Sequence, residues 1–173
     1  FRIAAPPPPP PPDPAVDEGG PWASRPDVAS TGTGSLVVWS WSNGGEAMTL
    51  ALRLDADGRP DGAPIALAEL SSNPVVAAAG GRYAVLWNEW DGGVVTRGAL
   101  VDASGVTPIA PTVPGNVIDV AGGDTGFLVL HTHEDDRTAV HAALLSADGA
   151  LVRDLAVVED DEVPPTTDSA AWL

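Results

Sequence analysis

Three histidines are the residues of this chain whose type and spacing best suit metal chemistry. His131 and His133 are separated by one residue, so on a β-strand both imidazoles lie on one face. With residues 134–137 as the connection to the next strand, residue 131 lies opposite residue 140, and His141 points to the other face. A shift of one residue would bring the three imidazoles together, as a zinc site requires. The expected register separates them, so we predict surface histidines and no metal site.

Tryptophan and acidic side chains suit a carbohydrate site. Trp41 and Trp90 come where an expected strand passes into a loop, and an exposed indole there can stack on a sugar ring or anchor a protein interface. Glu89 directly precedes Trp90. We take Trp41, Trp90, Glu89 and His133 as candidate ligand-binding residues. The alternative is that the tryptophans only cover the rim of a loop.

The sequence lacks the common catalytic motifs. It has no Gly-x-Ser-x-Gly elbow, no His-Glu-x-x-His and no lysine for a phosphate-binding loop. Asp55-x-Asp57-Gly58 followed by Asp61 resembles a shortened calcium loop, but calcium needs about 6–8 oxygen ligands. We interpret this run as a β-turn. We therefore predict no enzyme activity and no cofactor, with a glycoside hydrolase acting through Glu89 as an alternative.

The charge balance limits the possible partners. The chain has 24 acidic and 8 basic residues, a net charge of −16, and every basic residue is arginine. Such a surface repels nucleic acid and anionic membranes. The absence of cysteine excludes disulfides and thiolate metal sites, and no apolar run approaches the roughly 18 residues of a membrane span. A second copy, another surface protein or a glycan are the partners that we expect.

The elements that must position these residues are repeated along the chain. Three segments align, with Trp39, Trp87 and Leu130 at equivalent sites that an apolar core role explains. The matching runs are 26–30, 36–39, 50–58 and 65–67 in the first copy, 74–78, 84–87, 98–105 and 109–110 in the second, and 117–121, 127–130, 141–149 and 155–158 in the third.

Each copy predicts four short strands in about 45 residues. The second run of each copy is continuously apolar, as expected for a strand covered on both faces of its sheet. The third run ends in a turn in which Gly58, Gly105 or Gly149 supplies a positive φ. The pattern predicts an all-β fold of three tandem four-stranded units.

These motifs resemble a family of large secreted bacterial proteins with tandem units. The family pattern is a Pro-x-Val-Ala start, a Leu-Val-Val-Trp strand and an Asp-Gly turn after the third strand. Here Pro26 and Trp39 match it in the first copy and Pro74 and Trp87 in the second, whereas the third has Val117 and Leu130 instead. The resemblance covers residues 26–173 and implies β-propeller blades. It carries over no catalytic residues.

The number of copies leaves the closure of the fold open. Propellers typically have about four to eight blades, and three copies are visible. There are three alternatives. Two chains share six blades, the chain is part of a longer protein, or the three units close as a β-trefoil or β-prism.

The first 25 residues differ from the repeats. Seven consecutive prolines, Pro6 to Pro12, predict a polyproline II rod of roughly 20 Å. This arm is a spacer, or it docks on a neighbour through Phe1 and Ile3. The expected organisation is an arm at 1–25, repeat units at about 26–73, 74–116 and 117–167, and the start of a fourth at 168–173.

A noncatalytic extracellular module is the function that this sequence favours. Exposed strand edges in an unclosed repeat array invite pairing with another copy, as in a surface layer, stalk or fibre. A glycan-binding lectin is the second hypothesis.

Overall fold

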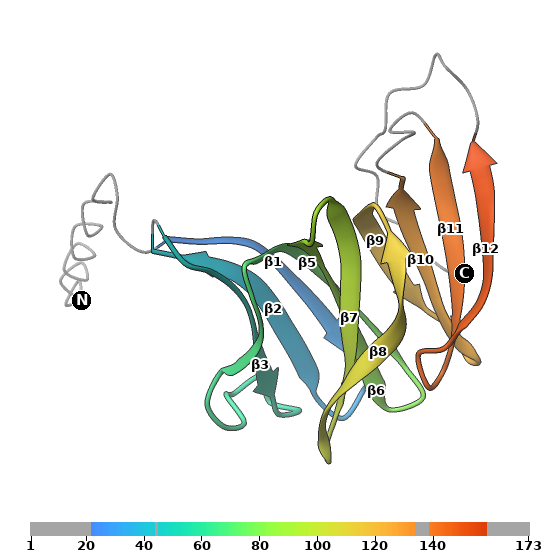
Figure 1. The fold of residues 1–173 in the computed structure, drawn as a ribbon. Coiled ribbons are helices and arrows are strands. Elements are labelled where there is room, and N and C mark those ends of the chain that lie inside the picture. Colours follow the sequence, from blue (N-terminus) through green and yellow to red (C-terminus); the bar gives the residue numbers. More distant parts are fainter. Residues whose placement is uncertain (1–21, 44, 134–138, 159–173) are drawn as a thin grey trace, which may run out of the picture.

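The chain forms three antiparallel sheets of four strands each, arranged side by side (Figure 1). The computed structural model describes residues 22–43, 45–133 and 139–158. Within each sheet, the order of the strands in space is their order along the chain. Each sheet is therefore a simple meander, and it corresponds to one of the predicted units.

The strands have the following bounds. The first sheet contains β1 (Trp22–Ser30), β2 (Ser35–Ser42), β3 (Ala47–Leu54) and β4 (Ile65–Glu69). The second contains β5 (Ser71–Ala79), β6 (Arg82–Trp90), β7 (Val94–Asp102) and β8 (Gly105–Pro114). The third contains β9 (Asn116–Gly122), β10 (Gly126–Thr132), β11 (Val140–Ser146) and β12 (Leu151–Val158).

Two apolar cores hold the three sheets together. The first lies between the first and second sheets, where Leu36 and Val38 meet Val85 and Trp87. The second lies between the second and third sheets and includes Leu86, Leu100, Phe127, Val129 and Leu145. The second sheet therefore contributes opposite faces to two different cores.

Strand burial follows from this stacking. β6 is buried at six consecutive positions, Tyr83 to Asn88, because both faces of its sheet are covered. β2 alternates between buried and half-buried residues because only one face of the first sheet is covered. The prediction of a strand covered on both faces is confirmed for the second unit and not for the first.

The predicted turns after the third strands are confirmed. The Gly58 N–H donates to the Asp55 carbonyl at 3.0 Å, and the Gly149 N–H donates to the Ser146 carbonyl at 2.8 Å. Both glycines have the positive φ that these turns require, 77° and 82°. The Asp55 carboxylate accepts the N–H groups of Asp57 and Arg59. It is thus occupied by its own turn, in agreement with a turn role.

The backbone of β1 is irregular near its start. β1 has a register shift between Ser24 and Asp27, and Arg25 within it has a φ of 51°. The Asp27 carboxylate accepts the Val76 N–H of β5 at 2.7 Å. The side chain of Asp27, next to the bulge, thus links the first sheet to the second.

The unit boundaries differ slightly from the predicted ones. β1 begins at Trp22 and β5 at Ser71, before the expected starts at residues 26 and 74. Side chains alone do not show how early a paired strand begins. The predicted arm residues Phe1, Ile3, Pro6 and Pro12, and the expected fourth unit at 168–173, lie outside the described residues.

Within residues 22–43, 45–133 and 139–158, no helix has the length and hydrophobicity needed to cross a bilayer.

Candidate functional site

Three sites on the paired second and third strands are equivalent in the three sheets. One is on the second strand, one is two residues later, and one lies opposite the first on the third strand. They hold Trp39, Trp41 and Leu50 in the first sheet, Trp87, Glu89 and Arg97 in the second, and His131, His133 and His141 in the third.

This equivalence corrects the repeat alignment. In the second sheet, Trp87 faces the first sheet. In the third sheet, Val129 faces the second sheet, and by strand alternation His131 shares that face while Leu130 lies on the other. The counterpart of Trp87 is therefore His131 and not Leu130. The sequence-based alignment of the third copy is therefore wrong by one residue. Leucine is a common core residue and histidine is not, so the sequence favoured Leu130 over His131.

The histidines come together on one face of the third sheet. His131 lies directly opposite His141 in the β10–β11 pairing, so the predicted register, with residue 131 opposite 140, is wrong by one. The ring centroids are 5.2 Å apart for His131 and His133, 5.4 Å for His131 and His141, and 4.1 Å for His133 and His141. His131 is completely buried and is not a surface histidine.

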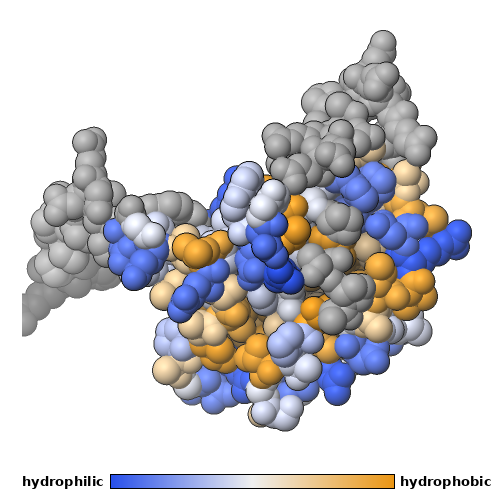
Figure 2. All heavy atoms as spheres, viewed as in Figure 1, coloured by the Kyte–Doolittle hydropathy of each residue, from blue (hydrophilic) through white to orange (hydrophobic). Residues whose placement is uncertain are grey.

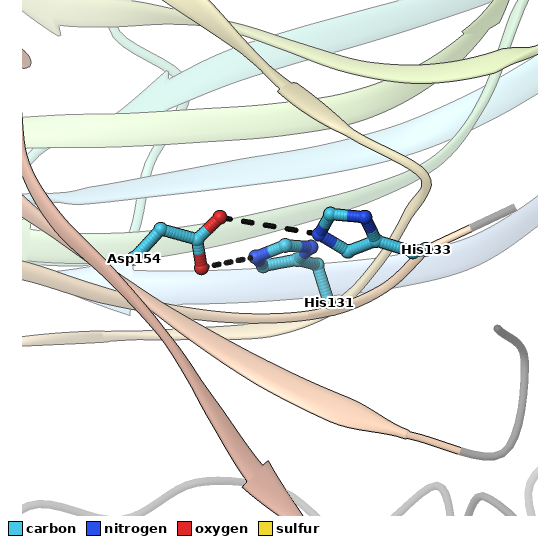
Figure 3. A group of neighbouring side chains, drawn as sticks. All are labelled: His131, His133 and Asp154. Carbon is cyan, nitrogen blue, oxygen red and sulfur yellow. Dashed lines mark hydrogen bonds and ion pairs between the residues drawn. The ribbon is translucent and has the colours of Figure 1, made fainter. Parts of the chain in front are cut away.

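Asp154 of β12 completes this cluster (Figure 3). Its carboxylate oxygens lie 3.2 Å from Nε2 of His131 and 3.9 Å from Nε2 of His133. The His133 Nε2 is buried and has no hydrogen-bond partner among the described residues. Burial lowers the pKa of His131, and the hydrogen bond and charge of Asp154 oppose that shift. We name His131, His133, His141 and Asp154 the histidine cluster.

The corresponding sites of the second sheet form an ionic cluster. The Trp87 indole N–H donates to the Glu89 carboxylate at 2.8 Å. The Arg97 guanidinium donates to Glu89 at 2.8 Å and to Asp91 at 2.9 Å. Glu89 therefore accepts two hydrogen bonds within its own sheet.

Trp90 and Trp41 lie in different places. Trp90 is 71% exposed and lines a pocket of about 520 Å³ together with Ser72, Asn88 and Asn116. Trp41 does not line that pocket; it shares a face of β2 with Trp39 and is half-buried. Of the four candidate residues, only Trp90 and Glu89 line this pocket, and His133 belongs to the histidine cluster.

The fold is similar to that of solved propellers. No family model and no curated protein matches the chain. The β-propeller domain of the Trilobed protease from Pyrococcus furiosus, which has an open velcro topology, is similar with a TM-score of 0.55 and 10% identity. That match covers 79% of this chain and 43% of the other chain. The acylaminoacyl peptidase of Pyrococcus horikoshii gives a TM-score of 0.49 at 10% identity, covering 79% of this chain and 25% of that one.

The three sheets are β-propeller blades. The first similarity carries this fold assignment, together with the meander topology, and it favours blades over a trefoil or prism. The chain spans less than half the length of either neighbour. The predicted kinship with secreted tandem-repeat proteins stays a prediction.

The blades have two kinds of face. We call the face that carries Trp39, Trp87 or His131 the leading face, and the face that carries Val38, Leu86 or Leu130 the trailing face. Both blade contacts in the molecule join a leading face to the trailing face of the preceding blade. The leading face of the first blade and the trailing face of the third blade pack on no other described blade.

Proposed function

We propose that this chain is a noncatalytic extracellular module that assembles with copies of itself through its two uncovered blade faces. The observation that carries the proposal is the difference in burial between equivalent residues. Trp87 is 5% exposed between two blades, whereas Trp39, at the same site of the first blade, is only half-buried. Leu86 is 2% exposed, and its counterpart Leu130 is half-buried.

The two uncovered faces are complementary to each other. The leading face of the first blade presents Trp39 and Trp41, and the trailing face of the third presents Leu128, Leu130 and Leu144. Both blade contacts within the chain likewise join a leading face to a trailing face. Figure 2 shows hydrophobic residues at the surface over the first blade and along β12. A second copy therefore offers each face the partner that it lacks.

Such a contact is head-to-tail. The leading face of one copy packs on the trailing face of the next, so the assembly closes as a ring or continues as a filament. Two copies closing a ring would supply six blades, within the usual range for propellers. A filament would suit the surface layer, stalk or fibre that the sequence favours.

The noncatalytic and extracellular parts of the proposal rest on other observations. The Glu89 carboxylate is engaged by Trp87 and Arg97, which argues against its use as a proton donor to a sugar. The acidic composition and the proline-rich arm suit a displayed protein.

The mass in solution tests the assembly. Light scattering on a sizing column should give at least twice the 17.6 kDa of one chain. Trp39→Asp should reduce the mass to that of one chain, because a buried carboxylate in the contact would be strongly unfavourable. Val106→Asp is the matched control, since Val106 is exposed on β8 of the central blade, away from both faces. A wild-type chain that remains single at high concentration would refute the proposal.

A mixing experiment tests the head-to-tail geometry. Trp39→Asp and Leu130→Asp should each be single chains, because each has one damaged face. Mixed in equal amounts, they should form a species of two chains through the one leading face and the one trailing face left intact. A mixture that stays at the mass of one chain contradicts this arrangement, even if the wild type assembles.

Glycan binding is a second candidate, favoured by the pocket beside Trp90. An indole that is 71% exposed beside Ser72, Asn88 and Asn116 combines a stacking surface with hydrogen-bonding groups. On a glycan array, Trp90→Ala should abolish any binding, whereas Trp41→Ala should preserve it. Absence of wild-type binding, or equal loss in both variants, would argue against this pocket as a sugar site.

A further inference from the structure

We propose that the histidine cluster binds one divalent first-row transition metal ion, preferentially zinc, through His131, His133 and Asp154. This inference is independent of the assembly proposal. It replaces our sequence-based prediction of no metal site, which depended on the register that the β10–β11 pairing contradicts.

The ligand atoms are already close to the geometry of a tetrahedral site. With metal–ligand bonds of about 2.0–2.1 Å, neighbouring ligand atoms around zinc are roughly 3.3 Å apart. The Asp154 carboxylate lies 3.2 Å from Nε2 of His131 and 3.9 Å from Nε2 of His133. All three potential ligand atoms lie within 4.8 Å of one another. Small side-chain rotations, without any strand movement, would bring them onto one ion.

The orientation of the rings supports this assignment. Both imidazoles direct Nε2 toward the same carboxylate (Figure 3). The buried Nε2 of His133 lacks a hydrogen-bond partner among the described residues, and a buried polar atom without a partner is unfavourable. A metal ion between the rings and the carboxylate would satisfy it.

The donor set selects the class of metal. Two imidazole nitrogens and one carboxylate oxygen suit zinc, cobalt, nickel and copper, whereas calcium and magnesium require a shell of oxygens. The ring centroids of His141 and His133 are 4.1 Å apart, so His141 supplies a further imidazole beside the site. The fourth position is then filled either by His141 or by a solvent molecule.

The repeat itself does not require histidines at these sites. The first blade has Trp39, Trp41 and Leu50 there, and the second has an ionic cluster built on Glu89 and Arg97. All three histidines of the chain occupy the equivalent sites of the third blade. The first two blades fold without histidine at these sites. The gathering of all three histidines in the third blade therefore indicates a function other than folding.

A bound ion would fasten an exposed edge strand. Asp154 belongs to β12, the outermost strand of the third blade, whose residues 151–157 are all exposed. His131 lies on β10, a more central strand of this blade, and His133 is the residue after the end of β10. Coordination by residues from β10 and β12 would tie the edge strand across β11 to the interior of the blade.

Zinc titration of the untagged full-length chain tests the proposal. After removal of metals by a chelator, calorimetry near neutral pH should show one zinc ion per chain with a dissociation constant of roughly micromolar or tighter. Zinc should also raise the melting temperature, since a ligand that binds only the folded state stabilises it. Magnesium and calcium should do neither.

Two substitutions link binding to this cluster. His133→Ala and Asp154→Asn should each weaken zinc binding by at least about tenfold. His133 and Asp154 are partly exposed, so both variants should fold, as circular dichroism can check; His131→Ala is avoided because His131 is fully buried. Asp91→Asn is the control for loss of one acidic surface group. His141→Ala reports whether that ring is the fourth ligand.

The outcomes separate cleanly. Stoichiometric binding that is lost in His133→Ala and Asp154→Asn but kept in Asp91→Asn supports the site. No zinc binding near micromolar concentration by the folded wild type overturns it. Binding that is unchanged in folded His133→Ala also overturns it, because the ion would then be held elsewhere.

Discussion

The close approach of β9 to β5 makes Gly122 the most informative position at which to test the packing of the blades. A Cβ atom added at Gly122 would lie 1.9 Å from the Ala78 carbonyl oxygen of β5. Ordinary contacts of this kind begin near 3.4 Å. The two strands would therefore have to separate by about 1.5 Å.

The expected cost follows from what that separation disturbs. The obstacle is backbone, which cannot rotate away as a side chain can. Phe127 of the second core is paired with Gly122 across the sheet, so a shift of β9 would disturb that core. Overpacking typically costs about 1–3 kcal/mol, and we expect Gly122→Ala to lie at the upper end, near 3 kcal/mol. For a chain of this size, that corresponds to a fall in melting temperature of roughly 6–12 °C.

The neighbouring glycine provides a matched control. A Cβ at Gly123 meets no atom closer than 3.9 Å, so Gly123→Ala should change the melting temperature by no more than about 2 °C. Both variants are compared with the wild type by thermal melting and by urea denaturation. If Gly122→Ala melts within the same range as Gly123→Ala, the reasoning about the β5–β9 contact is refuted.

Two further predictions concern the contacts between blades. Phe127 is 1% exposed between the second and third blades, so Phe127→Ala should lower the free energy of unfolding in urea by about 3–5 kcal/mol. Val106→Ala, at an exposed site, should lower it by less than about 1 kcal/mol. An equal loss of stability in the two variants would contradict the place of Phe127 in the core. The Asp27 carboxylate accepts the Val76 N–H at 2.7 Å, so Asp27→Ala should cost about 1–3 kcal/mol and accelerate hydrogen exchange at the Val76 amide. Asp57→Ala, at an exposed site, should leave the exchange rate of the Val76 amide unchanged. If the Val76 amide exchanges as slowly in Asp27→Ala as in the wild type, the hydrogen bond from Val76 to Asp27 is ruled out.

The blade architecture was predictable because it depends on local pattern. Short apolar runs separated by Gly-containing turns predict meanders of β-strands, and the turns at Gly58 and Gly149 have the conformations that their sequences predict. The number of units and the four strands in each follow from the repeat itself. The boundaries were less accurate, since strand pairing begins at Trp22 and Ser71 rather than at the repeat signatures.

The candidate site was only partly predictable. The sequence shows that His131 and His133 share a face of their strand, but their relation to His141 depends on the register across a connection. A change of one residue in that register moves a side chain to the other face of the sheet. Asp154 carried no signal, because an acidic residue on an edge strand resembles many others in this acidic chain.

By itself, the sequence determined the all-β fold, the three repeated units and the side-chain chemistry available to them, because hydrophobic periodicity and turn residues act over short stretches of chain. Only the tertiary structure decided which residues meet. Pairing across hairpins placed His131 opposite His141, and the stacking of blades buried Trp87 while leaving Trp39 on an uncovered face. Register and stacking depend on contacts between residues distant in the chain, and those contacts are set when the sheets pack together, not by the pattern within any one strand.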